Sequence, residues 1–213
     1  MPQVALAEFL AAVQAGELVS FPTDTVPALA TRPEAGDRIY QLKQRSQTKP
    51  LILMAASLQD LLPYVTGTEG ELAAWTALAE RYWPGALTLV LPASDRLPAA
   101  MNPERTGTLG IRVPAHPLAR YLLAHTGPLA TTSVNRSGQP PLETMAAIQA
   151  QFPAVITLTE AALEELYARW IGSPPPAADH RQGSGQPSTV AAWTGQGWQV
   201  LRQGSITLDA AVP

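Results

Sequence analysis

The sequence contains no cysteine and no long apolar segment. The absence of cysteine excludes disulfides, cysteine-based zinc sites and thiol catalysis. No apolar run approaches the roughly 20 residues that span a bilayer, so we expect no contact with a membrane. Residues 1–8 lack a positively charged start and include Glu8, which is not typical of a signal peptide. These absences favour a cytoplasmic protein.

Lysine is the next scarcity, since Lys43 and Lys49 are the only two lysines among 213 residues. Both lie in one short segment with Arg45 between them, whereas the whole chain has a net charge of -3. An acidic balance argues against general coating of nucleic acid but permits a local basic pocket. The segment is either a solvated face or a phosphate-binding loop, and the scarcity of lysine elsewhere favours phosphate binding.

Apolar runs alternate with helical patterns along the chain and predict a single α/β domain, residues 1–213, with a twisted, open, mixed sheet and flanking helices. Pro27 should confine its segment to an edge or irregular strand. Residues 172–187, rich in Gly, Pro, Ser and Gln, are either a mobile lid or a plain connector. The strands are expected at 18–22, 51–55, 86–91, 108–113, 128–133, 154–158, 188–193 and 198–202. The helices are expected at 4–14, 37–44, 57–62 (capped by Ser57), 69–82, 118–125, 144–151 and 160–170.

Three further loops follow predicted strands and contain hydroxyl or arginine side chains. Residues 23–25 read Thr-Asp-Thr, which either satisfies a turn or faces a ligand. Residues 131–138 combine four hydroxyls, an amide, an arginine and a glycine, which suits an anion or a small polar molecule. Ser188 and Arg202 could face one pocket across a strand pair.

Arg112 stands inside an otherwise apolar predicted strand. A buried arginine must be paired with an anion or face a ligand, and both interpretations remain open.

Several common sites are absent from the sequence. It has no G-x-x-x-x-G-K-[ST] phosphate loop. His116, His125 and His180 lack the spacing of metal ligands, and no order of Ser, His and Asp suggests a catalytic triad. We identify no metal ligand among the side chains.

An ordered set of motifs resembles the YrdC-like threonylcarbamoyl-AMP synthases of the short bacterial type. Each motif is modest, but together they follow the family's order from about residue 16 to residue 204. They are Pro22-Thr23-Asp24-Thr25-Val26, Lys43-x-Arg45, Lys49-Pro50-Leu51, Trp83-Pro84-Gly85-Ala86-Leu87-Thr88, Gly110-Ile111-Arg112-Val113-Pro114-x-His116-Pro117, Thr132-Ser133-x-Asn135-x-Ser137-Gly138-x-Pro140, Pro187-Ser188-Thr189-Val190 and Leu201-Arg202-x-Gly204.

The resemblance implies a sheet around a deep, positively charged cavity. It implies a nucleotidyltransferase that converts L-threonine, bicarbonate and ATP, with Mg²⁺, into threonylcarbamoyl-AMP and pyrophosphate. A tRNA threonylcarbamoyltransferase complex would then use the product to modify N6 of the adenosine at tRNA position 37. Direct binding of double-stranded RNA or tRNA is a further expectation.

The resemblance also assigns residues. Threonine would be bound by Thr25, Arg112, Ser133 and Ser188. ATP would be bound by Lys43, Arg45, Lys49, Thr108, Asn135, Ser137, Thr144 and Arg202. The cations expected to take part in catalysis are Lys43, Arg45, Lys49 and Arg112.

The chain departs from the family's pattern at three places. Pro27 and Ala28 stand where an aromatic residue and a glycine are usual, Val134 stands where alanine is usual, and residues 159–186 follow a different pattern. Two alternatives stay open: a nucleotide- or RNA-binding module of the same fold without catalysis, and a related enzyme that uses carbamoyl phosphate.

Overall fold

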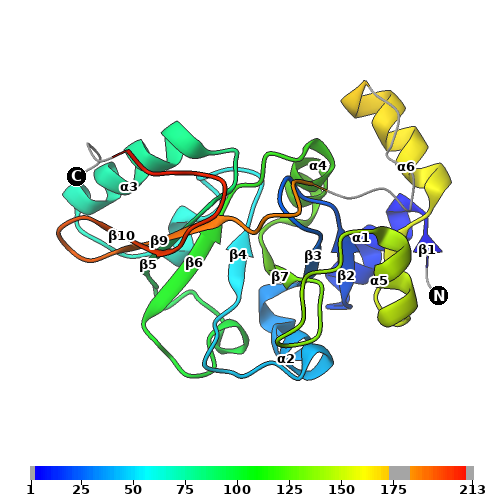
Figure 1. Cartoon of the computed structure of the whole chain (residues 1–213), viewed down its shortest axis with the longest axis horizontal. Coiled ribbons are helices and arrows are strands. Elements are labelled where there is room, and N and C mark those ends of the chain that lie inside the picture. The colour runs from blue at the N-terminus through cyan, green and yellow to red at the C-terminus, as the bar shows by residue number, and fades with distance from the viewer. Residues whose placement is uncertain (1–2, 173–182, 210–213) are drawn as a thin grey trace.

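The centre of the protein is an eight-stranded mixed sheet with the order β10-β9-β5-β6-β4-β7-β3-β2 (Figure 1). The computed structural model describes residues 3–172 and 183–209. Within the sheet, β4–β6 and β5–β9 are parallel, and the other neighbours are antiparallel. The strands are β1 (Gln3–Val4), β2 (Val19–Phe21), β3 (Ala28–Thr31), β4 (Ile52–Met54), β5 (Leu87–Pro92), β6 (Thr108–Arg112), β7 (Leu129–Ser133), β8 (Thr157–Leu158), β9 (Thr189–Trp193) and β10 (Trp198–Arg202).

Helices cover both faces of the sheet. They are α1 (Leu6–Gln14), α2 (Asp37–Lys43), α3 (Glu69–Tyr82), α4 (Pro117–Thr126), α5 (Met145–Gln151) and α6 (Glu160–Leu166). The mixed α/β fold predicted from the sequence is therefore confirmed.

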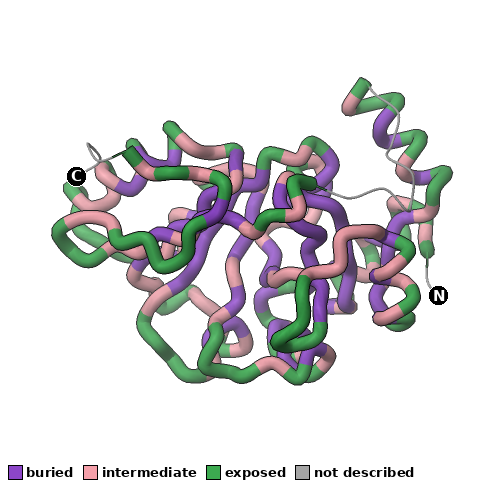
Figure 2. Tube along the Cα trace, viewed as in Figure 1, coloured by how far each residue is buried: buried purple, intermediate pink, exposed green. Residues whose placement is uncertain are grey.

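Alternating side chains of the strands divide the core into two layers. Leu53 packs into the layer beneath α2, α3 and α5, whereas its neighbour Met54 packs into the layer beneath α1, α4 and α6. This follows from the two-residue repeat of a strand. Figure 2 shows the result, a buried sheet interior with exposure concentrated in the outer loops and helix faces.

Local sequence signals explain where the elements begin and end. The longest predicted helix, 69–82, coincides with α3. It begins in a capping box: Thr68 Oγ1 accepts a hydrogen bond from Glu71 N at 3.3 Å, and Glu71 Oε2 accepts one from Thr68 N at 2.9 Å. Thr144 caps α5 as predicted, accepting a hydrogen bond from Ala147 N. No helix of the described residues is both long and apolar enough to cross a membrane.

The expectation for Pro27 is wrong, because β3 lies inside the sheet between β2 and β7. The strand begins at Ala28, one residue after the proline, so the missing N–H removes no bond from the ladder. The Pro27 carbonyl instead accepts a hydrogen bond from Val134 N. The edge strand on this side of the sheet is β2, which makes a parallel bridge from Val19 to Ile156 beside the small β1–β8 sheet.

Three other expected elements differ in the structure. Ser57 closes a turn with Asp60 rather than capping a helix, and a 3₁₀ turn follows at Leu62–Tyr64. The strand expected at 154–158 is reduced to β8. The helix expected at 160–170 divides into α6 and a π-helical turn, Tyr167–Ile171. The segment expected as a lid falls mostly on residues 173–182, outside the described residues.

The central strand β4 gives a direct test of this architecture. Leu53 is fully buried, so Leu53→Ala should lower the free energy of unfolding by about 2–5 kcal/mol, through lost burial and the cavity it leaves. Leu201, 57% exposed on β10, is the matched control, and Leu201→Ala should change stability by less than about 0.5 kcal/mol. Urea unfolding of both variants measures the difference. Equal effects would contradict the burial assigned to β4.

Candidate functional site

Arg112 is a buried charged side chain held by several hydrogen bonds. It ends β6, is only 4% exposed, and makes three hydrogen bonds. Nε donates to Gly85 O at 3.0 Å, Nη1 to Thr25 Oγ1 at 2.8 Å and Nη2 to Asp24 Oδ2 at 2.8 Å. Since a guanidinium has five N–H groups, these three bonds leave two available.

The ion pair between Arg112 and Asp24 confirms one of the two interpretations left open by the sequence. Burial lowers the pKa of Arg112, the Asp24 carboxylate opposes that shift, and the nearby Arg202 adds to it. The other Asp24 oxygen accepts from Ala115 N at 3.0 Å. The Asp24 carboxylate is thus held by Arg112 itself and by the backbone of the segment that follows β6.

Arg112 also lines a cavity of ≈ 160 Å³ on the α1/α4 face of the sheet. The strand registers place Ala28 opposite Ser133, Ile52 opposite Thr131 and Met54 opposite Arg112, and all six residues line it. Three arginines and several hydroxyls surround the space, and no Asp or Glu of the described residues lines it. The predicted residues that it brings together are Thr25, Arg45, Arg112, Ser133, Ser188 and Arg202.

Arg202 and Ser188 meet across the β9–β10 hairpin, as the sequence predicted. Arg202 Nη2 donates to Ser188 O at 2.8 Å, and Ser188 Oγ lies 2.8 Å from Thr88 Oγ1. On the loop after α2, Arg45 Nε donates to Lys49 O at 3.1 Å. Burial lowers the pKa of both Arg45 and Arg202. Two partly buried cations, one on the loop after α2 and one on β10, therefore line the cavity.

Lys43 is not at the cavity surface. Its side chain is 2% exposed, and Nζ donates to Ser133 O and, at 2.9 Å, to Asn135 Oδ1. Burial and the neighbouring Arg45 cation lower the pKa of Lys43 to about 7. The expected phosphate contact of Lys43 thus has no direct support from its position.

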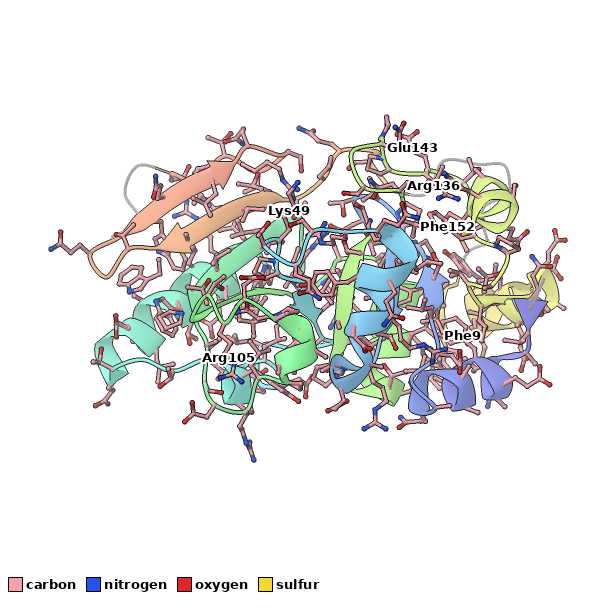
Figure 3. The ribbon with its side chains drawn as sticks, turned by 90° about the horizontal axis from the view of Figure 1, so that it is seen from below. Phe9, Lys49, Arg105, Arg136, Glu143 and Phe152 are labelled. Carbon is pink, nitrogen blue, oxygen red and sulfur yellow. The ribbon has the colours of Figure 1, made fainter. Side chains whose placement is uncertain are left out.

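Five other predicted residues also lie outside the cavity lining. Lys49 is exposed on the loop after α2 and is labelled in Figure 3. Asn135 and Ser137 belong to the loop after β7, and Thr144 caps α5. Thr108 begins β6, at the opposite end of that strand from Arg112. Their ligand-binding roles stay predictions.

Asp24 and Thr88 are important polar residues that the predicted site omits. Thr88 is buried on β5 and hydrogen-bonds Ser188. The sequence contained a signal for Asp24, because a buried arginine needs an anionic partner. Asp24 lies in the loop after a predicted strand, next to the predicted site residue Thr25. Its partner lies 88 residues away, and only the sheet order brings the two together.

The described end of the segment expected as a lid lies against the first loop. Ser184 N donates to Asp24 O at 3.1 Å, and Gly185 N donates to Thr25 O at 2.8 Å. Gly183 has φ +75, and a Cβ there would lie 2.4 Å from Thr23 O, so only glycine fits. Pro187 then lines the cavity. Residues 183–187 therefore form part of the wall near Arg112.

A second hollow in the described part of the chain contains none of the predicted site residues. A larger hollow of ≈ 570 Å³ runs along α3 and is lined mainly by apolar and small side chains with Glu80. Among residues 3–172 and 183–209, no cluster of three or more His, Asp or Glu side chains is suited to hold a metal ion. The fold and the site thus define an α/β protein with one arginine-lined cavity beside the basic loop.

Comparison with known proteins gives the family. The family model described as "Telomere recombination" (Sua5, YciO and YrdC) matches residues 11–204. The chain belongs to this Sua5/YciO/YrdC family. The threonylcarbamoyl-AMP synthase of Chromohalobacter salexigens is 38% identical over 162 residues, which cover 74% of this chain and 85% of that protein. The synthase of Bacillus subtilis is 41% identical over 146 residues, covering 65% of this chain and 40% of that longer protein.

Solved structures agree. Sua5 of P. abyssi, solved with L-threonine, is 28% identical with a TM-score of 0.77; the match covers 93% of this chain and 54% of that one. YciO of E. coli is 22% identical with a TM-score of 0.72, covering 93% of this chain and 88% of that one, which shows the shared fold.

The buried lysine predicts an unusual titration. With ¹³C-labelled lysine, the chain should give two lysine side-chain signals, and Lys49→Arg removes one to assign the other. We expect the Lys43 signal to titrate with a midpoint at about 7, because burial and Arg45 disfavour the ammonium. A midpoint at its ordinary 10.5 would contradict the structure.

The same shift predicts the sign of a pH effect on stability. The unfolded chain keeps the ordinary lysine pKa of 10.5, so between pH 7 and 10.5 it binds more protons than the folded protein. The contribution of Lys43 should therefore make the free energy of unfolding rise with pH in this window. Lys43→Met removes it, so the wild type should gain more stability than the variant between about pH 7 and 9. Parallel urea curves for the two proteins would count against the shift.

Proposed function

We propose that this protein is an L-threonylcarbamoyladenylate synthase, a nucleotidyltransferase that forms threonylcarbamoyl-AMP and pyrophosphate from L-threonine, bicarbonate and ATP. The observation that carries the proposal is the convergence of Arg45, Arg112 and Arg202 on one cavity, in a chain 38% identical to a named synthase over most of both proteins. Substrates with a carboxylate and a triphosphate match such a set of guanidinium groups.

Arg112 is the proposed partner of the threonine carboxylate. Its position is fixed by Gly85, Thr25 and Asp24, and its two remaining N–H groups suit a bidentate bond to a carboxylate. Hydroxyls of Thr25, Ser133 and Ser188 surround the cavity and would bind the polar groups of the amino acid. A cavity of ≈ 160 Å³ is small compared with the roughly 300–1,000 Å³ of pockets for drug-sized ligands, which suits a single amino acid inside.

ATP would then lie at the mouth of the cavity. Arg45 and Arg202 both line the cavity, and Lys49 lies on the same loop as Arg45. Fixed cations of this kind stabilise charge that accumulates on phosphate oxygens during transfer. Thr108, Ser137 and Thr144 complete the proposed ATP-binding set, with Mg²⁺ arriving bound to the nucleotide.

The chemistry requires two bond-forming steps. The neutral amine of threonine attacks bicarbonate or CO₂ and gives a carbamate, with loss of water when bicarbonate reacts and of a proton to solvent when CO₂ reacts. A carbamate oxygen then attacks the α-phosphorus of ATP, and pyrophosphate leaves in line. Arg112 holds the amino acid, whereas the arginines and Lys49 offset the charge of the phosphates. A positively charged cavity is part of this proposal.

The wider context follows from the reaction. The product would pass to a tRNA threonylcarbamoyltransferase complex for modification at position 37. A cytoplasmic location and direct contact with tRNA or double-stranded RNA belong to the same proposal.

The reaction itself is the first test. Purified protein with threonine, bicarbonate and Mg-ATP should release pyrophosphate and form threonylcarbamoyl-AMP, detected by mass spectrometry. Valine in place of threonine should react far more slowly, because the buried hydroxyl groups of the cavity then lose their partner. ATP binding without threonine-dependent pyrophosphate would instead support the non-catalytic module, and turnover that needs carbamoyl phosphate would support the third hypothesis.

Single substitutions test the assignment of the cations. Arg112→Ala and Lys49→Ala should each lower kcat/KM by about 100-fold or more, because each removes a charge proposed to contact a substrate. Arg96→Ala is the matched control, since Arg96 is exposed on a loop remote from the cavity lining, and it should keep wild-type activity. Near wild-type rates for Arg112→Ala would show that threonine binds elsewhere.

A further inference from the structure

The interior of the protein contains an ammonium group without an acidic partner. Lys43 ends α2, and no carboxylate of the described residues pairs with it. Nζ instead donates to the carbonyl of Ser133 and to Asn135 Oδ1. A buried cation that relies on neutral acceptors is costly. We therefore ask which function of the buried Lys43 side chain its contacts explain.

The Asn135 amide is fully occupied by protein groups. Oδ1 accepts from Lys43 and, at 2.6 Å, from Ser133 Oγ. Nδ2 donates to Arg136 O at 2.9 Å and to Gln139 O at 2.7 Å. An amide oxygen has two lone pairs and the nitrogen two hydrogens, so no hydrogen-bonding position of this side chain is left for a ligand.

The contact with Lys43 fixes the orientation of the Asn135 side-chain amide. An ammonium group only donates, so the atom of Asn135 that meets it must be the oxygen. The nitrogen is then directed at the carbonyls of Arg136 and Gln139, which closes the loop after β7. A second link joins the same two elements, because Ser137 N donates to the Lys43 carbonyl at 3.3 Å. The end of α2 is thus fastened to the loop by both side chain and backbone.

We propose that Lys43 is a positioning residue: through Asn135 and the carbonyl of Ser133 it fixes the 133–139 loop and so places Ser133 in the cavity, without contacting a phosphate itself. The inference rests on the proposed role of this loop in substrate binding. It assigns different work to the two lysines of the chain. Lys49, exposed on the loop, is available to a phosphate, whereas Lys43 and Asn135 act as one internal unit.

A double-mutant cycle distinguishes the two roles. Lys43→Met and Asn135→Ala should each lower kcat/KM by about 10–100-fold, in line with residues that orient others in a site. The double variant should be no more than about threefold worse than the poorer single variant, because both changes release the same loop. Multiplied losses would overturn the proposal, since they would mean that Lys43 acts independently of Asn135.

The other lysine provides the matched control. Lys49→Met combined with Asn135→Ala should show multiplied losses, because a direct phosphate contact and an internal support are independent. Circular dichroism and urea unfolding of each variant check that the comparison is made between folded proteins.

A measurement on the wild type covers the case in which Lys43→Met does not fold. The side-chain NH₂ signals of Asn135, assigned with Asn135→Gln in ¹⁵N-labelled protein, should shift with the same pH midpoint as the Lys43 side-chain carbon. Arg45 is the charged neighbour acting on Lys43, and its guanidinium keeps its charge throughout this range. Asn135 signals that do not follow the Lys43 titration would overturn the proposal. This NMR titration does not depend on enzyme activity. An inactive wild-type protein would contradict the proposed synthase activity, whereas the titration alone would still test the positioning role of Lys43.

Discussion

A guanidinium at the end of a central strand determines how the surrounding segments must be arranged. Arg112 is almost completely buried, and desolvating a cation is tolerated only with an anion and further hydrogen bonds nearby. Asp24 and Thr25 from one loop and the Gly85 carbonyl from another meet that requirement. Each of these partners is itself held: Asp24 by Ala115 N, and the 23–25 loop by the backbone of residues 184–185. The contacts that stabilise the buried Arg112 guanidinium therefore also hold together this part of the cavity wall.

Among the residues that the structure describes, the two buried cations, Arg112 and Lys43, are stabilised in different ways. Arg112 has a carboxylate at 2.8 Å, whereas Lys43 has only a carbonyl and an amide oxygen. An arginine keeps its charge under nearly all conditions, so Arg112 stays a cation beside Asp24. The lysine has a pKa near neutrality and can lose its charge in the folded protein. Arg112 therefore suits the binding of a substrate anion, while Lys43 suits the internal arrangement of a loop.

Local patterns predicted the elements well and their partners poorly. The apolar runs at 108–113 and 128–133 became β6 and β7 with almost the same limits, because a buried strand bounded by turn residues is recognisable in isolation. The prediction of an edge strand at Pro27 was wrong, because the proline lies one residue before the start of β3 and not within its hydrogen-bonded ladder. The convergence of Thr25, Arg112, Ser133 and Arg202 came only from the resemblance. The pairs Asp24–Arg112 and Lys43–Asn135 join residues about 90 apart and depend on the order of strands, which a local pattern does not contain.

The departure at Pro27 and Ala28 acts on the cavity itself. Both residues line it, and Ala28 lies directly opposite Ser133 in the β3–β7 register. The proline is placed just before the strand, where its carbonyl holds Val134 of the loop that Lys43 supports. The wall at this point is therefore connected to the same loop from two sides, by Pro27 through the backbone and by Lys43 through Asn135. A change of side chain at residue 27 or 28 alters the surface that a ligand meets but leaves both attachments of the loop in place, because one uses a backbone carbonyl and the other lies behind Ser133. The side chains at 27 and 28 can therefore vary without loss of the two attachments that hold the loop bearing Ser133.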